Sequence, residues 1–301
     1  MTRLKKADIA PILAGLDEYD ARLKRTTGAS LRQIACRAAG VEEALIGKLT
    51  SQVRFAAVPV RSGLGVIDGF SGTVAGIVTH LGFEAFVTES SDVAGMAEGI
   101  ERGAYVLMLA DDERFVAITP EPRHVVDNNP ATAQGFVAAL ELMGGDLTGR
   151  SALILGCGPV GVAAATSLLD RGADIALCDL RHERVAAALR KLAGGAADRI
   201  READRTREDR IRIEEDARGA LRRYEVIFDA TNAGGFIEPS HLGPDTMVAA
   251  AGLPCGLTHE AMAEHQGRIV HDALEIGTAT MAVQAATALA GRAGAKKADN
   301  T

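Results

Sequence analysis

The sequence predicts an α/β protein of two parts: N-terminal helices with a small parallel α/β domain, followed by a second α/β domain. Short apolar runs alternate with helical patterns, which is typical of parallel sheets. A buried apolar run in the second half leads directly into a glycine-rich turn. The length of 301 residues suits two domains, and glycines at 144, 145 and 149 indicate a boundary near residue 145. We therefore expect domains at 1–145 and 146–301.

The elements of the first domain follow from hydrophobic periodicity. Prolines at 120, 122 and 130 indicate a loop, and Pro130 starts a helix with Asn129 as its N-cap. The elements expected in order are helices at 5–25 and 30–48, a strand at 54–60, a helix at 66–81, a strand at 85–88, a helix at 91–102, strands at 105–110 and 115–118, and a helix at 130–143.

The second domain is predicted to continue the alternation. Its expected elements are a strand at 151–155, a helix from the glycine turn to 171, strands at 174–178, 225–228, 247–251 and 269–270, and a last helix from about residue 278. One segment, 198–223, carries nine Arg against eight Asp and Glu residues, so its charges nearly cancel. Pairs such as Glu208 and Arg212 stand four residues apart, which predicts a solvated, salt-bridged helix.

The composition excludes several classes of protein. Acidic residues outnumber basic ones by 40 to 33, and the net charge of −7 argues against a general nucleic-acid-binding surface. The four cysteines show no metal-ligand spacing, so we expect no metal site and no disulfide framework but reduced thiols in a cytoplasm. We recognise no signal peptide, and the uncharged run 151–169 contains glycines and a proline that favour strand, turn and helix over a membrane span.

Residues 156–161, GCGPVG, fit the pattern G-x-G-x-x-G between a predicted strand and a predicted helix. Gly156 permits the tight turn, Gly158 lets a pyrophosphate approach the backbone, and Gly161 lets helix and sheet pack closely. The free N–H groups at the start of the helix then receive the phosphate charge. We therefore expect a Rossmann-type dinucleotide-binding domain, the alternative being a glycine turn that binds nothing.

An acidic residue follows the motif at the spacing of such a domain. Asp179 lies 18 residues beyond Gly161, at the end of the next predicted strand. Its carboxylate can bind both ribose hydroxyls and repel a 2′-phosphate, which favours NAD, whereas Arg181 and Arg184 leave NADP open. The residues expected in the cofactor site are Gly156, Gly158, Pro159, Val160, Gly161, Asp179, Thr231 and Thr278.

Polar residues also follow two predicted strands of the first domain, as RSG at 61–63 and as Asp111-Asp112. Ligands of open parallel sheets lie beyond the carboxyl ends of strands, where a carboxylate can hold an ammonium group. The acidic pair fits a solvated turn or helix cap equally well, and Ser62, Asn129 and Thr278 each fit an N-cap. The sequence contains no G-x-S-x-G, P-loop or HExxH motif, so hydride transfer is the expected chemistry.

Several segments together resemble a known family more specifically than the glycine turn does. They are RTTG at 25–28, VPVRSG at 58–63, GFEAFVT at 82–88, ADD at 110–112, NNP at 128–130 and IGTA at 276–279. In this order, and with the glycine turn, they resemble the PylD family of pyrrolysine biosynthesis dehydrogenases over about residues 4–290.

The resemblance implies NAD-dependent oxidation of the terminal amine of 3-methylornithyl-Nε-lysine, closure to the pyrroline ring of pyrrolysine and loss of ammonia. It implies an N-terminal helix that helps to close the substrate pocket, and Asp111, Ser62 and Asn129 as catalytic residues around the amine. Arg61 replaces a smaller polar residue of the family, and we expect it to affect substrate recognition. The expected substrate contacts are Leu4, Arg61, Ser62, Phe70, Asp111 and Asn129.

Two alternatives stand beside this hypothesis. The first is an NAD(P)-dependent dehydrogenase of another amino acid or hydroxy acid, and the second, from a different class, is a non-catalytic NAD-binding sensor. The partners expected are a small lysine-derived substrate and a second copy of the chain in a homodimer, with neither nucleic acid nor membrane.

Overall fold

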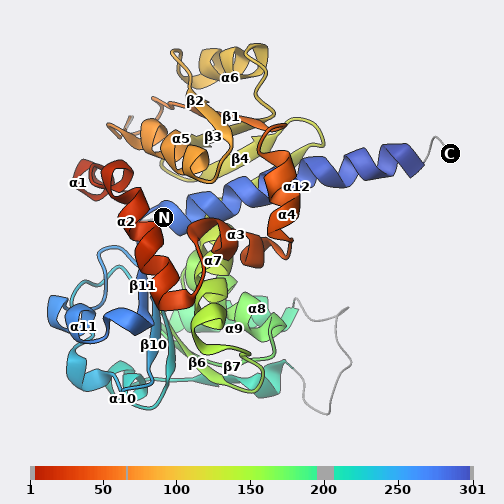
Figure 1. Cartoon of the computed structure of the whole chain (residues 1–301). Coiled ribbons are helices and arrows are strands. Elements are labelled where there is room, and N and C mark those ends of the chain that lie inside the picture. Colours follow the sequence, from red (N-terminus) through yellow and green to blue (C-terminus); the bar gives the residue numbers. More distant parts are fainter. Residues whose placement is uncertain (1–3, 66, 195–206, 299–301) are drawn as a thin grey trace. The chain divides into compact units, whose positions relative to one another are not determined.

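The computed structural model describes residues 4–65, 67–194 and 207–298, which form two compact units (Figure 1). The first unit takes its described residues from Met1–Lys24, Ala29–Gly135 and Ala273–Thr301, and the second from Arg25–Gly28 and Phe136–Asp272. This division differs from the expected domains at 1–145 and 146–301. The last helix contacts helices and strands of the first unit, so the chain returns to that unit at its end.

Four helices open the chain: α1 Lys6–Ile9, α2 Ile12–Thr27, α3 Leu31–Ala39 and α4 Glu43–Leu49. The single helix expected at 5–25 is therefore interrupted beside Pro11, a residue that has no N–H to donate and that constrains the residue before it. The helix expected at 30–48 is divided at Gly40, whose φ of 67° ends α3 in the left-handed region.

The sheet of the first unit has the order β2-β1-β3-β4-β5. Its strands are β1 Arg54–Val58, β2 Glu84–Val87, β3 Val106–Ala110, β4 Phe115–Thr119 and β5 His124–Asp127. The first three are parallel as predicted, but β4 and β5 are antiparallel. The segment of β5 was expected to be a loop, and that expectation is wrong, because the prolines at 120 and 122 lie in the turn between the two strands.

The helices of this unit are α5 Phe70–His80, α6 Asp92–Glu101, α12 Glu275–Ala298 and the first half of α7 Asn128–Gly144. α6 lies on the face of the sheet that carries Ala56 and Leu107, and a methyl group at Gly99 would come within 2.8 Å of the Leu107 side chain. α12 contacts β4, β5, α3 and α5. These helices pack against the sheet, and the carboxyl ends of β1, β2 and β3 continue into loops.

The second unit is a six-stranded parallel sheet with the order β11-β10-β9-β6-β7-β8. The strands are β6 Ser151–Leu155, β7 Asp174–Cys178, β8 Ile211–Ile213, β9 Val226–Asp229, β10 Met247–Ala250 and β11 Ile269–His271. The strand order reverses beside β6, since β7 follows on one side and β9 on the other. This is the Rossmann arrangement that the sequence predicts, and such a reversal is where nucleotides bind.

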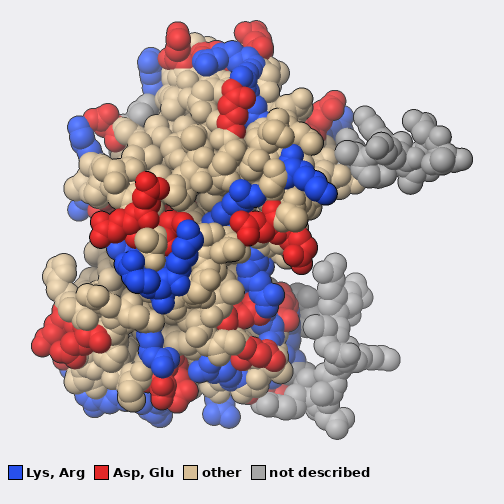
Figure 2. All heavy atoms as spheres, in the orientation of Figure 1, with Lys and Arg blue, Asp and Glu red and all other residues tan. Residues whose placement is uncertain are grey.

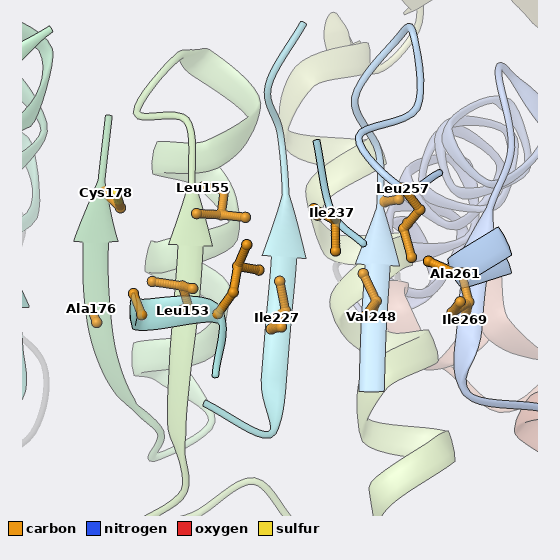
Figure 3. Close-up of a cluster of buried hydrophobic side chains, with 13 residues drawn as sticks. Leu153, Leu155, Ala176, Cys178, Ile227, Ile237, Val248, Leu257, Ala261 and Ile269 are labelled. Atoms are coloured by element: carbon orange, nitrogen blue, oxygen red, sulfur yellow. The ribbon is translucent and has the colours of Figure 1, made fainter. Parts of the chain in front are cut away.

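The helices between these strands are α8 Pro159–Asp170, α9 His182–Gly194, α10 Ala217–Leu221 and α11 His259–Glu264, with short 3₁₀ turns at Glu208–Arg210, Pro239–His241 and Gln266–Arg268. A core of buried apolar side chains lies on one face of the sheet (Figure 3). It includes Leu153 and Leu155 on β6, Ile227 on β9 and Val248 on β10. Leu153 and Leu155 stand two residues apart on β6, so both side chains point to the same face of the sheet.

The charged segment differs from its prediction. Of 198–223, residues 198–206 lie outside the described residues, and the remainder forms a 3₁₀ turn, β8 and α10 instead of one helix. Arg210 explains part of this difference, because its guanidinium binds the carbonyl oxygens of Leu169 and Ala173 and pairs with Asp174 at 3.3 Å. These contacts hold the segment against β7, where it adds an edge strand.

The surface shown in Figure 2 carries Lys and Arg next to Asp and Glu, without an extended field of one sign. Among the described residues many charged side chains are paired, as in Arg171 with Glu141 and Arg102 with Glu98. None of the helices in the described ranges is long and apolar enough to cross a bilayer.

Candidate active site

The glycine turn of the second unit joins β6 to α8, as the sequence predicts. Gly156 has a φ of 89°, and its N–H donates to the Cys178 carbonyl oxygen at 2.8 Å. A methyl group at Gly161 would overlap the Gly156 carbonyl oxygen, so α8 approaches the turn as closely as a backbone can. Both positions therefore require glycine, Gly156 for its left-handed backbone conformation and Gly161 for the close approach of α8 to the turn.

Gly158 differs from these two glycines, because a side-chain carbon there would meet no protein atom within 4 Å. Gly158 is the N-cap of α8, and Pro159 is the first helical residue. Open space beside a glycine, at the positive end of a 12-residue helix, suits a pyrophosphate group. The turn thus fits the dinucleotide that the sequence predicts for it.

Asp179 follows β7 and holds the glycine turn with its carboxylate. Its Oδ2 accepts the Cys157 N–H at 2.7 Å, and its Oδ1 accepts the Arg181 N–H at 2.9 Å. Burial and the adjacent Asp179 charge raise the pKa of the Cys157 thiol to about 12, so this thiol is neutral at physiological pH. Asp179 is then the charged side chain of the turn, and each oxygen keeps a lone pair for a ribose hydroxyl.

Thr231 lies beside the glycine turn, beyond the end of β9. Its N–H and hydroxyl both donate to Asp229 Oδ1, at 2.9 and 2.7 Å. Asp229 is fully buried, and burial raises the pKa of its carboxyl group, while its other oxygen accepts the Gly256 N–H at 3.1 Å. A methyl group at Gly156 would come within 3.1 Å of the Thr231 backbone nitrogen, so the structure brings this predicted cofactor residue together with the motif.

Thr278, the last residue predicted for the cofactor site, belongs to the first unit. The N-cap expectation for it is wrong, because α12 begins at Glu275 and the Thr278 N–H donates to the Leu274 carbonyl oxygen at 3.0 Å within the first turn. The Thr278 side chain is fully buried, and within the described part of the chain its hydroxyl has no hydrogen-bond partner. Its cofactor role stays a prediction.

A pocket of about 580 Å³, mouth included, lies at the carboxyl ends of β1 and β3 in the first unit. Leu4, Phe70 and Asp111 all line it, so the structure brings together three of the residues predicted to contact substrate. Leu4 is buried, and the Phe70 ring meets Phe115 edge to face with 5.3 Å between centroids. The walls are chiefly apolar, and the charged groups are carboxylates.

Asp111 stands at the mouth of the pocket and is exposed to solvent. Its Oδ1 accepts the N–H groups of Arg114 at 2.7 Å and Glu113 at 2.8 Å. The Arg114 N–H is the main reason why the pKa of Asp111 lies below its ordinary value. Asp111 is therefore an anion at neutral pH, held by one oxygen in its own turn.

Arg61 and Ser62 lie in an exposed loop beside the pocket but do not line it. The Arg61 N–H donates to Asp92 Oδ1 at 2.8 Å. The N-cap interpretation of Ser62 is wrong, because no helix begins there, and its carbonyl oxygen instead accepts the Gly65 N–H at 3.4 Å in a turn.

Asn129 does not line the pocket either, and its N-cap expectation is wrong because α7 begins one residue earlier, at Asn128. Asp127 has the capping contact, since its Oδ1 accepts the Asn129 N–H at 2.9 Å. The other carboxylate oxygen of Asp127 pairs with Arg114 at 3.0 Å. Because the Arg114 N–H binds Asp111, two residues connect Asn129 to the acid at the pocket mouth.

The remaining residues of the pocket are not among the predicted substrate contacts, although the pair Asp111-Asp112 was expected to be able to hold an ammonium group. The remaining residues are Val58, Val60, Gly65, Ile67, Ser71, Ala110 and Asp112. Four of them lie in the segments VPVRSG and ADD, so their position at the ends of predicted strands could have indicated that they line the pocket. Ile67, in the loop before α5, and Ser71, on α5, carry no motif, so only the folded chain brings them to the pocket.

A family model described as pyrrolysine biosynthesis protein PylD, N-terminal domain, matches residues 8–126. A solved quinate dehydrogenase from Corynebacterium glutamicum, in complex with NAD, has a TM-score of 0.52 and 16% identity, covering 79% of this chain and 94% of its own. At this identity the likeness concerns the fold.

Two curated relatives extend over nearly the whole chain. A pyrrolysine synthase of Methanosarcina barkeri is 26% identical over 283 residues, which is 93% of this chain and 97% of the relative. A pyrrolysine synthase of Methanosarcina acetivorans is 26% identical over 282 residues, which is 93% of this chain and 98% of the relative. The chain therefore matches the PylD family model in its N-terminal part and is similar to two pyrrolysine synthases over nearly its whole length.

Proposed function

We propose that the protein oxidises the terminal amine of 3-methylornithyl-Nε-lysine with NAD and forms the pyrroline ring of pyrrolysine, with release of ammonia. The PylD family match and the relatives named pyrrolysine synthase support the pathway. The observation that carries the proposal is the pocket lined by Leu4, Phe70 and Asp111. Its apolar walls suit the aliphatic chain of such a substrate, and a carboxylate at the mouth suits an ammonium group.

The reaction removes a hydride from the carbon beside the terminal amine and a proton from its nitrogen, leaving an imine. The α-amine then attacks the imine carbon, ammonia leaves, and a cyclic imine remains. When bound, NAD accepts the hydride. The chain's own task is to hold the substrate, to exclude water and to let the amine lose its proton.

The amine must be neutral before a hydride can leave. With a lysine-like pKa of about 10.4, deprotonation at pH 7 costs about 4.6 kcal/mol. Asp111 is a poor base for this step, because its pKa lies below the ordinary value of an aspartate. We therefore assign Asp111 to binding and orienting an amine of the substrate, with Ser62 and Asn129 as hydrogen-bond partners, and propose that the reacting amine reaches its neutral form by equilibration with the solvent.

The cofactor assignment rests on the second unit. Gly156, Gly158 and Gly161 would hold the pyrophosphate at the start of α8, and Asp179 would hold the ribose hydroxyls. Pro159 and Val160 form the first helical turn there, and Thr231 and Thr278 complete the predicted set.

We also propose a homodimer in the cytoplasm that binds neither nucleic acid nor membrane. All four cysteines are free thiols, which suits a reducing compartment. The net charge of −7 supports the absence of a nucleic-acid partner. Sedimentation of the purified protein gives the oligomeric state.

The decisive experiment mixes purified protein, NAD and synthetic 3-methylornithyl-Nε-lysine and follows NADH at 340 nm, with mass spectrometry of the product. We expect NADH together with the mass of the pyrroline product, and no reaction when either component is omitted. NADH formation from a simpler amino acid or hydroxy acid alone would favour a related dehydrogenase. NAD binding without turnover of any of these substrates would favour a sensor.

A further inference from the structure

The loop after β1 forms part of the substrate pocket. Residues 61–65 run from the end of β1 toward α5, and Gly65 lines the pocket while Arg61 and Ser62 stand beside it. The loop is exposed and contains no helix or strand of its own. Its shape therefore depends on what binds its backbone N–H groups.

Two carboxylates from neighbouring strand ends bind those groups. Asp112, beyond the end of β3, accepts the Leu64 N–H on Oδ2 at 2.6 Å. Asp92, the first residue of α6, the helix that follows β2, accepts the Arg61 N–H on Oδ1 at 2.8 Å. Because β2 and β3 flank β1, the two carboxylates reach the loop from the strands on either side of the one that leads into it.

The backbone around these contacts is adapted to a close approach. Gly63 has a φ of 71°, and a methyl group there would overlap the Asp112 carboxylate. Asp92 itself has a φ of 56°, a conformation that L-residues other than Asn, Asp and His rarely adopt. The left-handed conformation of Gly63 leaves room for the Asp112 carboxylate, and the left-handed conformation of Asp92 accompanies its own hydrogen bond to the loop.

Asp111 and Asp112 are consecutive and both line the pocket, yet their carboxylates have different partners. Asp111 binds N–H groups of its own turn, from Glu113 and Arg114, and none of the contacts found for it reaches the loop. Asp112 binds the loop across 48 residues of sequence. We propose that Asp112 is a positioning residue that holds residues 61–65 in place, so that Gly65 at the end of this loop lines the pocket, and that Asp111 alone of the pair binds the substrate's ammonium group.

This division of roles rests on the proposed function for its substrate, but the hydrogen bond itself is testable without turnover. Asp112→Ala removes the acceptor, whereas Asp112→Asn keeps an oxygen that can accept the Leu64 N–H and removes the negative charge. We expect Asp112→Ala to raise the KM for the dipeptide-like amine about tenfold with a smaller change in kcat, and Asp112→Asn to stay within about threefold of wild type.

Amide hydrogen exchange provides the readout that does not depend on activity. We expect the Leu64 amide to exchange about tenfold faster in Asp112→Ala than in wild type, and at nearly the wild-type rate in Asp112→Asn. Gly63→Ala is a second disrupting variant that retains Asp112, and it should also speed exchange at Leu64. The Kd for NAD should be unchanged in all three variants, because the altered residues belong to the unit without the glycine turn.

Two results would overturn the proposal. An equal loss of substrate binding in Asp112→Asn and Asp112→Ala would show that the charge of Asp112, and not its acceptor oxygen, matters to the substrate. Unchanged exchange at Leu64 in Asp112→Ala would show that the carboxylate does not hold the loop. A wild-type protein inactive with the proposed substrate would refute the proposed function, while the exchange experiment would still decide the role of Asp112 in the loop.

Discussion

The carboxylate of Asp179 accepts a hydrogen bond from the backbone N–H of Cys157, with 2.7 Å between oxygen and nitrogen. The bond joins the acid at the end of β7 to the second residue of the glycine turn. It fixes the negative charge beside the start of α8, where the phosphates and the adenosine ribose of a dinucleotide lie in this fold. We therefore expect this one side chain both to shape the turn and to select the cofactor.

Asp179→Asn should separate these two effects. The amide oxygen can still accept the Cys157 N–H, so we expect thermal stability close to wild type. The loss of charge should weaken NAD binding about tenfold, because hydrogen bonds to charged groups contribute about 1.5–3 kcal/mol, and it should relieve repulsion of a 2′-phosphate. Titration with NAD and with NADP measures both effects. An unchanged ratio of the two dissociation constants would refute the role of Asp179 in cofactor choice.

Gly158 and Gly161 form a matched pair of variants in the same turn. Gly161→Ala places a methyl group on the Gly156 carbonyl oxygen, so it should lower stability by about 1–3 kcal/mol and abolish NAD binding. The added methyl group of Gly158→Ala meets no protein atom within 4 Å, so the free energy of unfolding should stay near wild type. NAD binding should weaken at least tenfold if the pyrophosphate lies there. Denaturant unfolding and NAD titration separate the two variants. Wild-type affinity in Gly158→Ala would place the pyrophosphate elsewhere.

Much of the fold was predictable, because it depends on local pattern. Buried apolar runs such as β3 and β6 predict strands of a parallel sheet. The glycine pattern after β6 predicts the turn that joins β6 to α8 in the second unit. The antiparallel strand β5 was missed, because the nearby prolines belong to its turn and its residues are mostly exposed. The return of α12 to the first unit was also missed, since tertiary packing and not periodicity decides which sheet a helix covers.

The candidate site was predictable only in part for a related reason. Asp111 and Phe70 were assigned by resemblance, and both line the pocket. Asp112 has the same residue type and the same strand end as Asp111, so no local signal distinguishes the two. The difference lies in a hydrogen bond to Leu64 across 48 residues, which depends on the pairing of β1 with β3.

Asp111→Asn tests the binding role of that acid. The variant keeps the size of the side chain and removes the charge, so kcat/KM for the amine should fall at least about tenfold while NAD affinity stays near wild type. Steady-state kinetics with a separate NAD titration measure the two effects. Wild-type kcat/KM in Asp111→Asn would exclude the residue from the site.

The pH dependence of turnover should reflect the substrate's amine and not Asp111. The pKa of Asp111 lies below its ordinary value, so the carboxylate stays ionised as the pH is varied from 6 to 9. Turnover should rise over this range, because a growing fraction of the amine is neutral. The measurement is kcat/KM at constant ionic strength in wild type and Asp111→Asn. We expect parallel profiles, and a rise present only in wild type would instead make Asp111 the base.

The four cysteines should differ sharply in their reaction with iodoacetamide. Cys36, Cys157 and Cys178 are buried, and burial raises the pKa of Cys36 to about 11 and that of Cys157 to about 12. Thiolates are the reactive species, so these thiols should stay unmodified in the native protein up to about pH 9, while the half-buried Cys255 is labelled first. Intact-mass and peptide mass spectrometry identify the labelled site, and Cys255→Ser should abolish the first adduct. Rapid labelling of Cys157 in the native protein would mean that the glycine turn is open to solvent, contrary to its contacts with Asp179 and Cys178.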